Sequence, residues 1–194
     1  MNNDVKSTHS YIEDSRNEDV LIYINGEYFK RSEAKISVFD SGFLLGDGVW
    51  EGMRYHKNTF IFLDEHLNRL YNGAKSLSID IGFSQEELIE ILQDLMIKNN
   101  MSDDVHIRLI VSRGLKKTPY QHPNANILGS TIVAIPEYKK ADKGVNEVGV
   151  RLATVDTIRS TNKILDPKIN SLSKLNCILA CIEADNLDVD EGLM

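Results

Sequence analysis

The stretch "VWEGMRYHKNTFIFLDEHLNRLYNGAKSL", residues 49–77, decides the fold because its hydrophobic period changes halfway along. Its first half has two β-rich runs joined by the polar His56, Lys57 and Asn58, a pattern that predicts a β-hairpin. Its second half opens on Asp64, a residue type that caps helices, and then repeats apolar residues at helical spacing. These apolar residues are Leu67, Leu70, Tyr71, Ala74 and Leu77. Strands followed by an amphipathic helix predict an α+β domain.

The flanking sequence predicts a second hairpin and a second helix. Residues 20–30 form two short β-rich runs around Asn25 and Gly26, the pair that best tolerates a type I′ turn. Ser84 and Glu87 form a capping box at the start of the second helix. Its buried stripe is expected to consist of Leu88, Ile91, Leu92 and Leu95.

Two longer strands are predicted after the helices. The run "VHIRLIVS", residues 105–112, alternates between an apolar face and a face that carries Arg108, and "STIVAIP", residues 130–136, is rich in β-branched residues. Together with the elements above, these strands predict an N-terminal α/β domain over residues 19–138.

Polar sequence marks the ends of this domain. Residues 1–18 have no apolar period and are expected to form a disordered tail. Residues 139–147 are expected to be an interdomain linker. Residues 148–194 start a second, C-terminal domain with one helix, roughly residues 171–186, and have too little apolar surface to fold alone. The C-terminal domain is therefore expected to be incomplete.

The composition disfavours several classes of partner. The 194 residues contain 22 Lys and Arg against 29 Asp and Glu, and the net charge of -7 has the wrong sign for binding nucleic acid. The sequence has no signal peptide and no run of the ~20 apolar residues that span a membrane, which predicts a soluble, cytoplasmic protein. Cys177 and Cys181 lack the spacing of a zinc site, so no metal is expected.

The glycine-rich run "GDGVWEG" does not have the spacing of a phosphate-binding loop. Gly46, Gly48 and Gly52 fit neither the P-loop nor the dinucleotide-binding pattern, and no lysine follows them. We expect these glycines to allow a tight turn and a close approach of backbones before the strand.

The motifs "GDGVWEGMR" and "LDEHLNRL", in this order, resemble the class IV pyridoxal-phosphate aminotransferases. This family includes branched-chain aminotransferases, D-amino acid aminotransferases and aminodeoxychorismate lyase. The resemblance implies the α+β fold called fold type IV, or D-amino acid aminotransferase-like, in which a small α/β domain precedes a larger pseudo-barrel domain. It also implies pyridoxal 5'-phosphate as the cofactor, bound between the domains, and a homodimer that completes the site.

The resemblance assigns roles to three residues of the first domain. Arg69 matches the arginine that binds the cofactor's phosphate, for which a permanently charged, bidentate guanidinium is suited. Trp50 matches an aromatic residue of the substrate pocket, and Arg108 resembles an arginine near the substrate in branched-chain enzymes. Because an arginine in an apolar strand needs a partner, we expect Arg108 to bind either a carboxylate of the protein or that of a substrate.

The sequence departs from the family where the Schiff-base lysine is expected. That position holds Asn170, whose amide cannot react with the cofactor aldehyde. Three alternatives remain open. Lys174 can substitute if it lies one helical turn along on the same face, Lys168 can substitute from two residues before, or the site is inactive.

The implied function is a transaminase that moves an amino group between an amino acid and a 2-oxo acid. A branched-chain or other apolar amino acid is expected, because residues 112–123 lack the arginine and histidine pair of the D-amino acid enzymes. An aminodeoxychorismate lyase would use the same cofactor. Family members also have later active-site segments that find no match before Met194. The remaining alternative is therefore a catalytically inactive, truncated homologue that acts by associating with a partner chain.

Overall fold

The computed structural model describes residues 13–140 and 149–194, which form parts of two compact units. We call the unit formed by Asp14–Lys139 and Lys168–Ser173 the sheet unit. The unit to which the described residues of Lys140–Pro167 and Lys174–Met194 belong is called the α5 unit. Most of the expected linker, residues 141–147, lies outside the described residues. The sheet unit differs from the expected first domain because it includes the later segment Lys168–Ser173.

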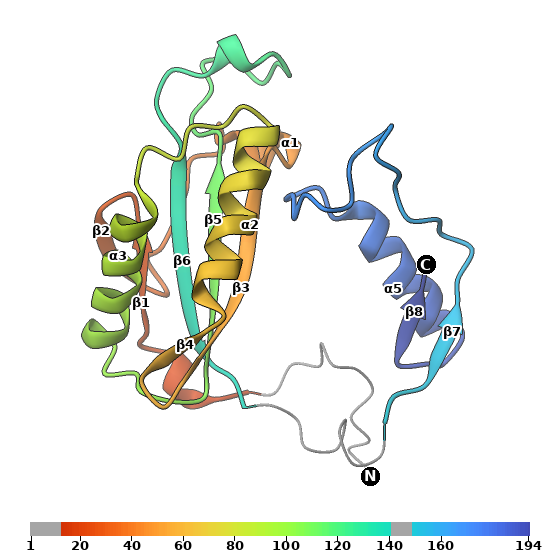
Figure 1. Cartoon of the computed structure of the whole chain (residues 1–194), viewed down its shortest axis with the longest axis horizontal. Helices are drawn as coiled ribbons and strands as arrows, with labels where there is room; N and C mark the ends of the chain where they lie inside the picture. Colours follow the sequence, from red (N-terminus) through yellow and green to blue (C-terminus); the bar gives the residue numbers. More distant parts are fainter. Residues whose placement is uncertain (1–12, 141–148) are drawn as a thin grey trace. The chain divides into compact units, whose positions relative to one another are not determined.

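The sheet unit contains a six-stranded antiparallel sheet, with strand order β2-β1-β6-β5-β3-β4 (Figure 1). The strands are β1 (Leu21–Ile24), β2 (Glu27–Lys30), β3 (Gly48–His56), β4 (Thr59–Ile61), β5 (Val105–Ser112) and β6 (Thr131–Tyr138). Both predicted hairpins are present. Asn25 and Gly26 have φ of 48° and 97°, as the expected turn requires, and Lys57 and Asn58 also have positive φ.

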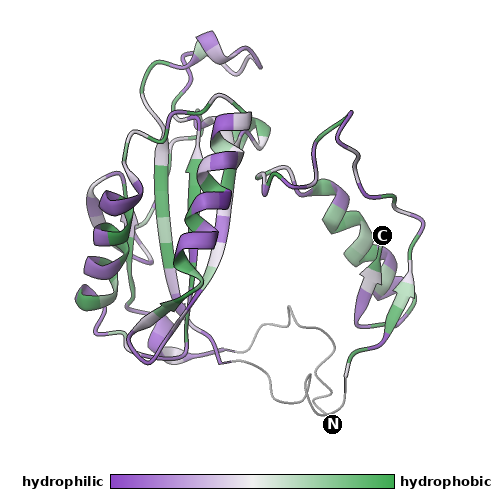
Figure 2. Ribbon diagram, viewed as in Figure 1, coloured by the Kyte–Doolittle hydropathy of each residue, from purple (hydrophilic) through white to green (hydrophobic). Residues whose placement is uncertain are grey.

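Two helices, α2 (Leu63–Ser76) and α3 (Gln85–Lys98), bury their apolar stripes against one face of this sheet. Figure 2 shows that hydrophobic and hydrophilic residues alternate along both helices, as expected when one side of each is buried. The core joins Leu67, Leu70, Leu88, Leu92 and Leu95 to Met53, Val105, Ile107, Leu109 and Val111 of the strands. The alternation along β5 therefore determines which strand residues face the helices and which face away.

The two helices begin differently. The predicted capping box of α3 is present, with Ser84 and Glu87 each bonding to the other's backbone. Helix α2, by contrast, begins at Leu63, and Asp64 lies inside its first turn. The N-cap is Phe62, in a left-handed conformation that the β4–α2 connection imposes, so the prediction that Asp64 caps the helix is wrong. A carboxylate in the first turn still interacts favourably with the helix dipole.

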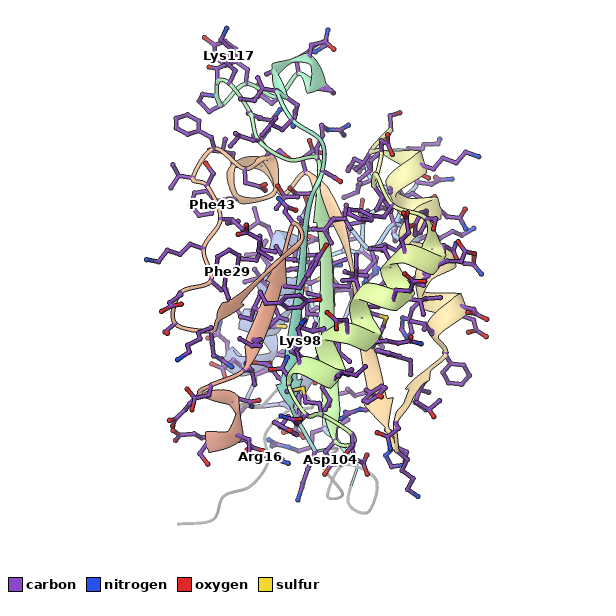
Figure 3. The ribbon with its side chains drawn as sticks, turned by 90° about the vertical axis from the view of Figure 1, so that its left-hand side faces the viewer. Arg16, Phe29, Phe43, Lys98, Asp104 and Lys117 are labelled. Atoms are coloured by element: carbon purple, nitrogen blue, oxygen red, sulfur yellow. The ribbon has the colours of Figure 1, made fainter. Side chains whose placement is uncertain are left out.

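Part of the expected N-terminal tail is ordered against the sheet. Ser15–Asn17 form a short 3-10 helix, η1, and the Asn17 side chain exchanges two hydrogen bonds with the backbone of Tyr138, at 3.0 and 2.7 Å. Arg16 lies over the Tyr138 ring, at the same end of the sheet unit as Asp104, and the loop that bears Lys117 extends from the opposite end (Figure 3). The ordered chain therefore begins earlier than the predicted residue 19.

The α5 unit contains α5 (Leu175–Asn186) and a parallel pair of strands, β7 (Leu152–Thr154) and β8 (Glu191–Leu193). The helix begins four residues later than predicted, with Lys174 as its N-cap. Glu183 ties it to the segment after β7, since its carboxylate accepts bonds from the backbone of Asp156 and the hydroxyl of Thr157, which lower the pKa of Glu183. None of the helices in residues 13–140 and 149–194 is long and apolar enough to cross a bilayer.

Candidate functional site

A buried carboxylate on β3 holds Arg69 of α2. The Nε atom of Arg69 donates to Oε1 of Glu51 at 2.6 Å, and its Nη2 atom donates to Oε2 at 2.6 Å. The Glu51 side chain is 0% exposed, whereas that of Arg69 is 52% exposed. This bidentate pair fixes the direction of the guanidinium while leaving part of it at the surface.

His66 completes the network around the carboxylate. It lies one turn before Arg69 on α2, and its Nδ1 atom is 2.8 Å from Oε2 of Glu51. The buried carboxylate thus takes part in three hydrogen bonds with two side chains, which offset much of the cost of removing its charge from water. We call Glu51, His66 and Arg69 the Glu51 network.

The network also favours the charged form of Arg69. Its hydrogen bond to Glu51 raises the pKa of Arg69, a side chain that is already protonated at pH 7. The two bonds to Glu51 use Nε and Nη2, and Nη1 takes part in neither. A half-exposed, fixed cation of this kind suits a phosphate group.

The role of Glu51 was not predicted from the sequence, although its position in the strand pattern indicated one. Glu51 alternates on β3 with Val49 and Met53, both of which are buried on the face that packs against α2. A glutamate at such a position needs a cationic partner from the covering helix. Arg69 lies on the predicted helix between the apolar residues Leu67 and Leu70. The pair of Glu51 and Arg69 could therefore have been inferred from the strand alternation and the helix periodicity together.

Trp50 and Arg108 form a second pair, on the other face of the sheet. The Cζ atom of Arg108 lies 4.2 Å from the centre of the Trp50 ring, a cation–π contact between neighbouring strands. Within the described residues, no carboxylate oxygen forms a salt bridge with Arg108. Arg108 was expected to bind either a protein carboxylate or a substrate carboxylate, and in the described part of the chain no protein carboxylate forms a salt bridge with it. Because Trp50 and Glu51 are consecutive on β3, the sheet separates this pair from the Glu51 network.

His106 lies on the same face as Arg108 and fills the space left by a glycine. A Cβ atom at Gly52 would lie 2.9 Å from Nε2 of His106, so only glycine lets the ring approach the strand this closely. Burial, and then the positive charges of Lys139, Arg54 and Arg108, lower the pKa of His106 to about 4. The imidazole is therefore neutral at pH 7 and does not repel Arg108.

We predict that the sheet unit loses stability when the pH falls from about 6.5 to about 4. In this window the unfolded chain binds a proton at His106 that the folded chain does not bind, so the free energy of unfolding decreases, by on the order of 2 kcal/mol once solvent screening of the partly exposed ring is included. The change His106→Gln should flatten this part of the stability profile, measured by urea unfolding at each pH. An imidazole resonance of His106 that titrates near pH 6.5 in the folded chain would contradict the prediction.

Part of the segment Lys168–Ser173 pairs with the edge of β3, where Ser171 forms an isolated antiparallel bridge with Val49. The backbone N–H of Trp50 donates to the carbonyl of Asn170 at 3.0 Å, and that of Leu172 donates to the carbonyl of Gly48 at 2.9 Å. The side-chain amide of Asn170 donates to the carbonyl of Trp50 at 2.8 Å. Asn170 therefore anchors this segment to β3.

This pairing corrects the basis on which Lys174 was expected to replace the missing lysine. Asn170 is not in a helix, because its backbone pairs with β3, and α5 begins only after Lys174. The two residues therefore do not share a helix face. Lys174 is half-buried and belongs to the α5 unit, whereas Lys168 is exposed and belongs to the sheet unit with Arg69.

Two glycines of the motif have the conformations expected for a turn and a close approach. Gly46 is the C-cap of the short helix α1 (Ser41–Leu45), with a φ of 66°. A Cβ atom at Gly48 would lie 2.5 Å from the carbonyl oxygen of Val111 on β5. The prediction that these glycines serve the backbone is confirmed.

Comparisons with known proteins agree with the resemblance seen in the motifs. The sequence pattern of the amino-transferase class IV family matches residues 48–194. Branched-chain-amino-acid aminotransferase-like protein 1 of Arabidopsis thaliana is 39% identical over 178 residues, which cover 92% of this chain and 32% of that protein. A putative branched-chain-amino-acid aminotransferase of Methanocaldococcus jannaschii is 38% identical over 173 residues, which cover 89% of this chain and 58% of that protein.

Solved structures give the same relationship. The branched-chain amino acid aminotransferase of T.th., crystallised with pyridoxamine 5'-phosphate, superposes with a TM-score of 0.81 at 29% identity, covering 91% of this chain and 59% of that one. The same enzyme complexed with N-(5'-phosphopyridoxyl)-L-glutamate gives a TM-score of 0.79, also at 29% identity, covering 91% of this chain and 58% of that one. These superpositions confirm the expected fold type IV. The chain spans less than two thirds of the length of each of these relatives.

Proposed function

Because this chain belongs to the amino-transferase class IV family, we propose that it carries the cofactor-binding and substrate-binding part of a pyridoxal-phosphate-dependent transaminase. The reaction would move an amino group between an amino acid, branched-chain or otherwise apolar, and a 2-oxo acid. The observation that carries this proposal is the Glu51 network, which presents one fixed, half-exposed guanidinium within the matched residues.

The residues of the chain fit the two reactive ends of the cofactor. A phosphate needs a permanent cation with fixed donors, which Arg69 supplies, and an aldehyde needs a primary amine, for which Lys174 and Lys168 are the candidates. The bound cofactor would supply an electron sink for the substrate's α-carbon. Glu51 orients Arg69 through two hydrogen bonds, and His66 in turn bonds to Glu51.

Trp50 and Arg108 are the proposed substrate-binding pair. The indole ring gives an apolar surface for the substrate side chain, and the guanidinium above it can bind a carboxylate. These residues lie on the sheet face opposite the Glu51 network, so the proposal assigns the two arginines to different ligands or different groups of one ligand.

The proposal includes a homodimer in the cytoplasm. Several large apolar side chains are exposed on two segments of the sheet unit that are joined by backbone hydrogen bonds, from Lys116 to Phe39 and from Ser41 to Gly114. These side chains are Ile36, Val38, Phe39, Phe43, Tyr120, Ile127 and Leu128. An apolar patch of this kind supports association between copies of the chain.

A non-catalytic role is the second candidate, and Asn170 favours it. The asparagine occupies the position of the family's lysine, and its amide is already used to anchor the segment to β3. Under this alternative the chain would act only by associating with a partner chain.

The affinity of the 194-residue chain for pyridoxal 5'-phosphate tests the proposal. The change Arg69→Lys keeps the charge but loses the bidentate fork, and we expect it to weaken binding by about tenfold. Binding is measured by titration calorimetry, with Arg31→Lys as the matched control, since Arg31 also pairs with one carboxylate, that of Glu137, far along the sheet. The proposal fails if the unchanged chain shows no saturable binding or if the two variants bind equally.

A further inference from the structure

Lys116 is a buried lysine in the loop between β5 and β6. The residue is 2% exposed, and within the described residues no carboxylate forms a salt bridge with it. Its Nζ atom donates instead to Oδ1 of Asn126 at 2.9 Å and to the backbone carbonyl of His122 at 3.4 Å. A buried charge is costly without such acceptors. These bonds tie Lys116 to residues ten and six positions later, so the ammonium holds the loop closed from the inside.

The same loop is joined to the segment that enters α1. The backbone N–H of Lys116 donates to the carbonyl of Phe39 at 3.0 Å, and that of Ser41 donates to the carbonyl of Gly114 at 2.9 Å. Asn126, which accepts the bond from the ammonium, also donates through Nδ2 to the carbonyl of Gly114 at 3.2 Å. Lys116 and Asn126 therefore support both chain segments from their interior.

The outside of these two segments is apolar and almost without charge. We call the surface formed by residues 36–45 and 118–130 the arm surface; it carries the exposed apolar patch described above. In residues 36–45 the only Asp, Glu, Lys or Arg is Asp40, which is 3% exposed, and residues 118–130 contain none. Charged residues make up 26% of the chain, so their depletion on two adjoining segments is typical of the core of an interface.

The charge of the chain favours a second copy as the partner at the arm surface. The net charge is -7, so two copies repel each other where their acidic surfaces meet. In a two-fold symmetric interface the same patch faces itself, and a charged patch would then face its own sign. The arm surface avoids this repulsion. It also has almost no charge by which an acidic or basic partner of another kind could be selected.

We propose that Lys116 is the positioning residue of the arm surface, and that its ammonium holds the loop in the shape through which two copies of the chain associate. This inference rests on the proposed function, which includes a homodimer, and adds the residue on which association depends. Because Lys116 is buried, it acts through the loop and not by contact with the partner. Lys117 is its exposed neighbour in the same loop and provides a matched control (Figure 3).

Sedimentation velocity over a series of protein concentrations measures association of the 194-residue chain. Lys116→Met should raise the dissociation constant of the dimer by about tenfold, because the loop loses the bonds that hold it. Lys117→Met should change this constant by less than about twofold. Phe43→Ser removes a side chain that is 66% exposed on the arm surface, and it should also weaken association by about tenfold or more.

Hydrogen exchange of backbone amides shows whether Lys116 acts through the loop. The N–H groups of Ser41, Lys116, Lys117 and Ile127 all donate to carbonyls of the two segments or of the loop. At a dilution at which every variant is a monomer, Lys116→Met should speed exchange at these four amides and leave the amides of β3 unchanged. Phe43→Ser should leave all of them unchanged, because it alters only the surface.

The outcomes separate this inference from the proposed function. If Phe43→Ser weakens the dimer and Lys116→Met does not, the inference fails and the homodimer stands. A dimer that Phe43→Ser does not weaken forms through another surface, which also overturns the inference. A chain that is monomeric at every concentration overturns both the inference and the homodimer, whereas the affinity for pyridoxal 5'-phosphate tests the transaminase independently.

A second pair of variants covers the case in which Lys116→Met does not fold. Lys116→Gln removes the charge but keeps N–H donors for the two acceptors, and Lys117→Gln is its control. A larger loss of association and faster exchange of the loop amides in Lys116→Gln than in Lys117→Gln would support the inference. Equal behaviour of these two variants would overturn it.

Discussion

The change Arg69→Met is expected to lower the free energy of unfolding of the sheet unit by about 3 kcal/mol, because it leaves the carboxylate of Glu51 buried without its main counter-charge. This value lies at the lower end of the range for broken buried ion pairs, since Arg69 is itself half exposed and solvent screens part of the interaction. His66 remains within 2.8 Å of the carboxylate and offers only partial compensation. Fluorescence during urea unfolding measures the effect, because Trp50 is the single tryptophan and lies in the sheet unit.

Two further variants show whether the buried charge is the cause. Replacing both partners, with Glu51→Leu added to Arg69→Met, should recover much of the lost stability, since no charge is then buried. Arg31→Met is the matched control, because Arg31 and Glu137 are both more than a third exposed and their pair should contribute no more than about 1 kcal/mol. Equal losses in Arg69→Met and Arg31→Met would contradict the burial argument.

The sequence was sufficient for the elements that depend on local patterns. The turn at Asn25 and Gly26, the capping box of Ser84 and Glu87, and the alternation along β5 are each confirmed. In all three, the interactions that decide the structure lie within a few residues of one another. The start of α2 differs because the turn from β4 into the helix, and not the capping preference of Asp64, determines where the helix begins.

The site residues could be predicted only in part, because their partners come from distant segments. The motif indicated Arg69, but its pairing with Glu51 depends on how α2 lies across β3. Leu172 lies three residues before Leu175, a spacing that agrees with a helix. Pairing with β3, however, gives the backbone N–H of Leu172 a partner that the start of a helix would not supply. Tertiary pairing therefore overrides local helix propensity in this segment. As a result, Asn170 and Lys174 do not lie on one helix face as expected.

The change Gly48→Ala is expected to destabilise the sheet unit by about 3 kcal/mol. A Cβ atom at this position would lie 2.5 Å from the carbonyl oxygen of Val111, 2.9 Å from the Cα atom of Ser112 and 2.6 Å from Cδ1 of Leu172. The first two atoms belong to the backbone of β5, so β3 cannot keep its pairing with β5 unless one strand moves.

The third contact connects this glycine to the candidate site. Leu172 also donates its backbone N–H to the carbonyl of Gly48, so a displaced Leu172 would loosen the pairing of Asn170 and Leu172 with β3. Gly129→Ala is the matched control, because no atom lies within 4 Å of the added Cβ and its stability should change by less than about 0.5 kcal/mol. Urea unfolding followed by Trp50 fluorescence gives the stabilities. If Gly48→Ala is no less stable than Gly129→Ala, β3 does not make this close contact with β5 and Leu172.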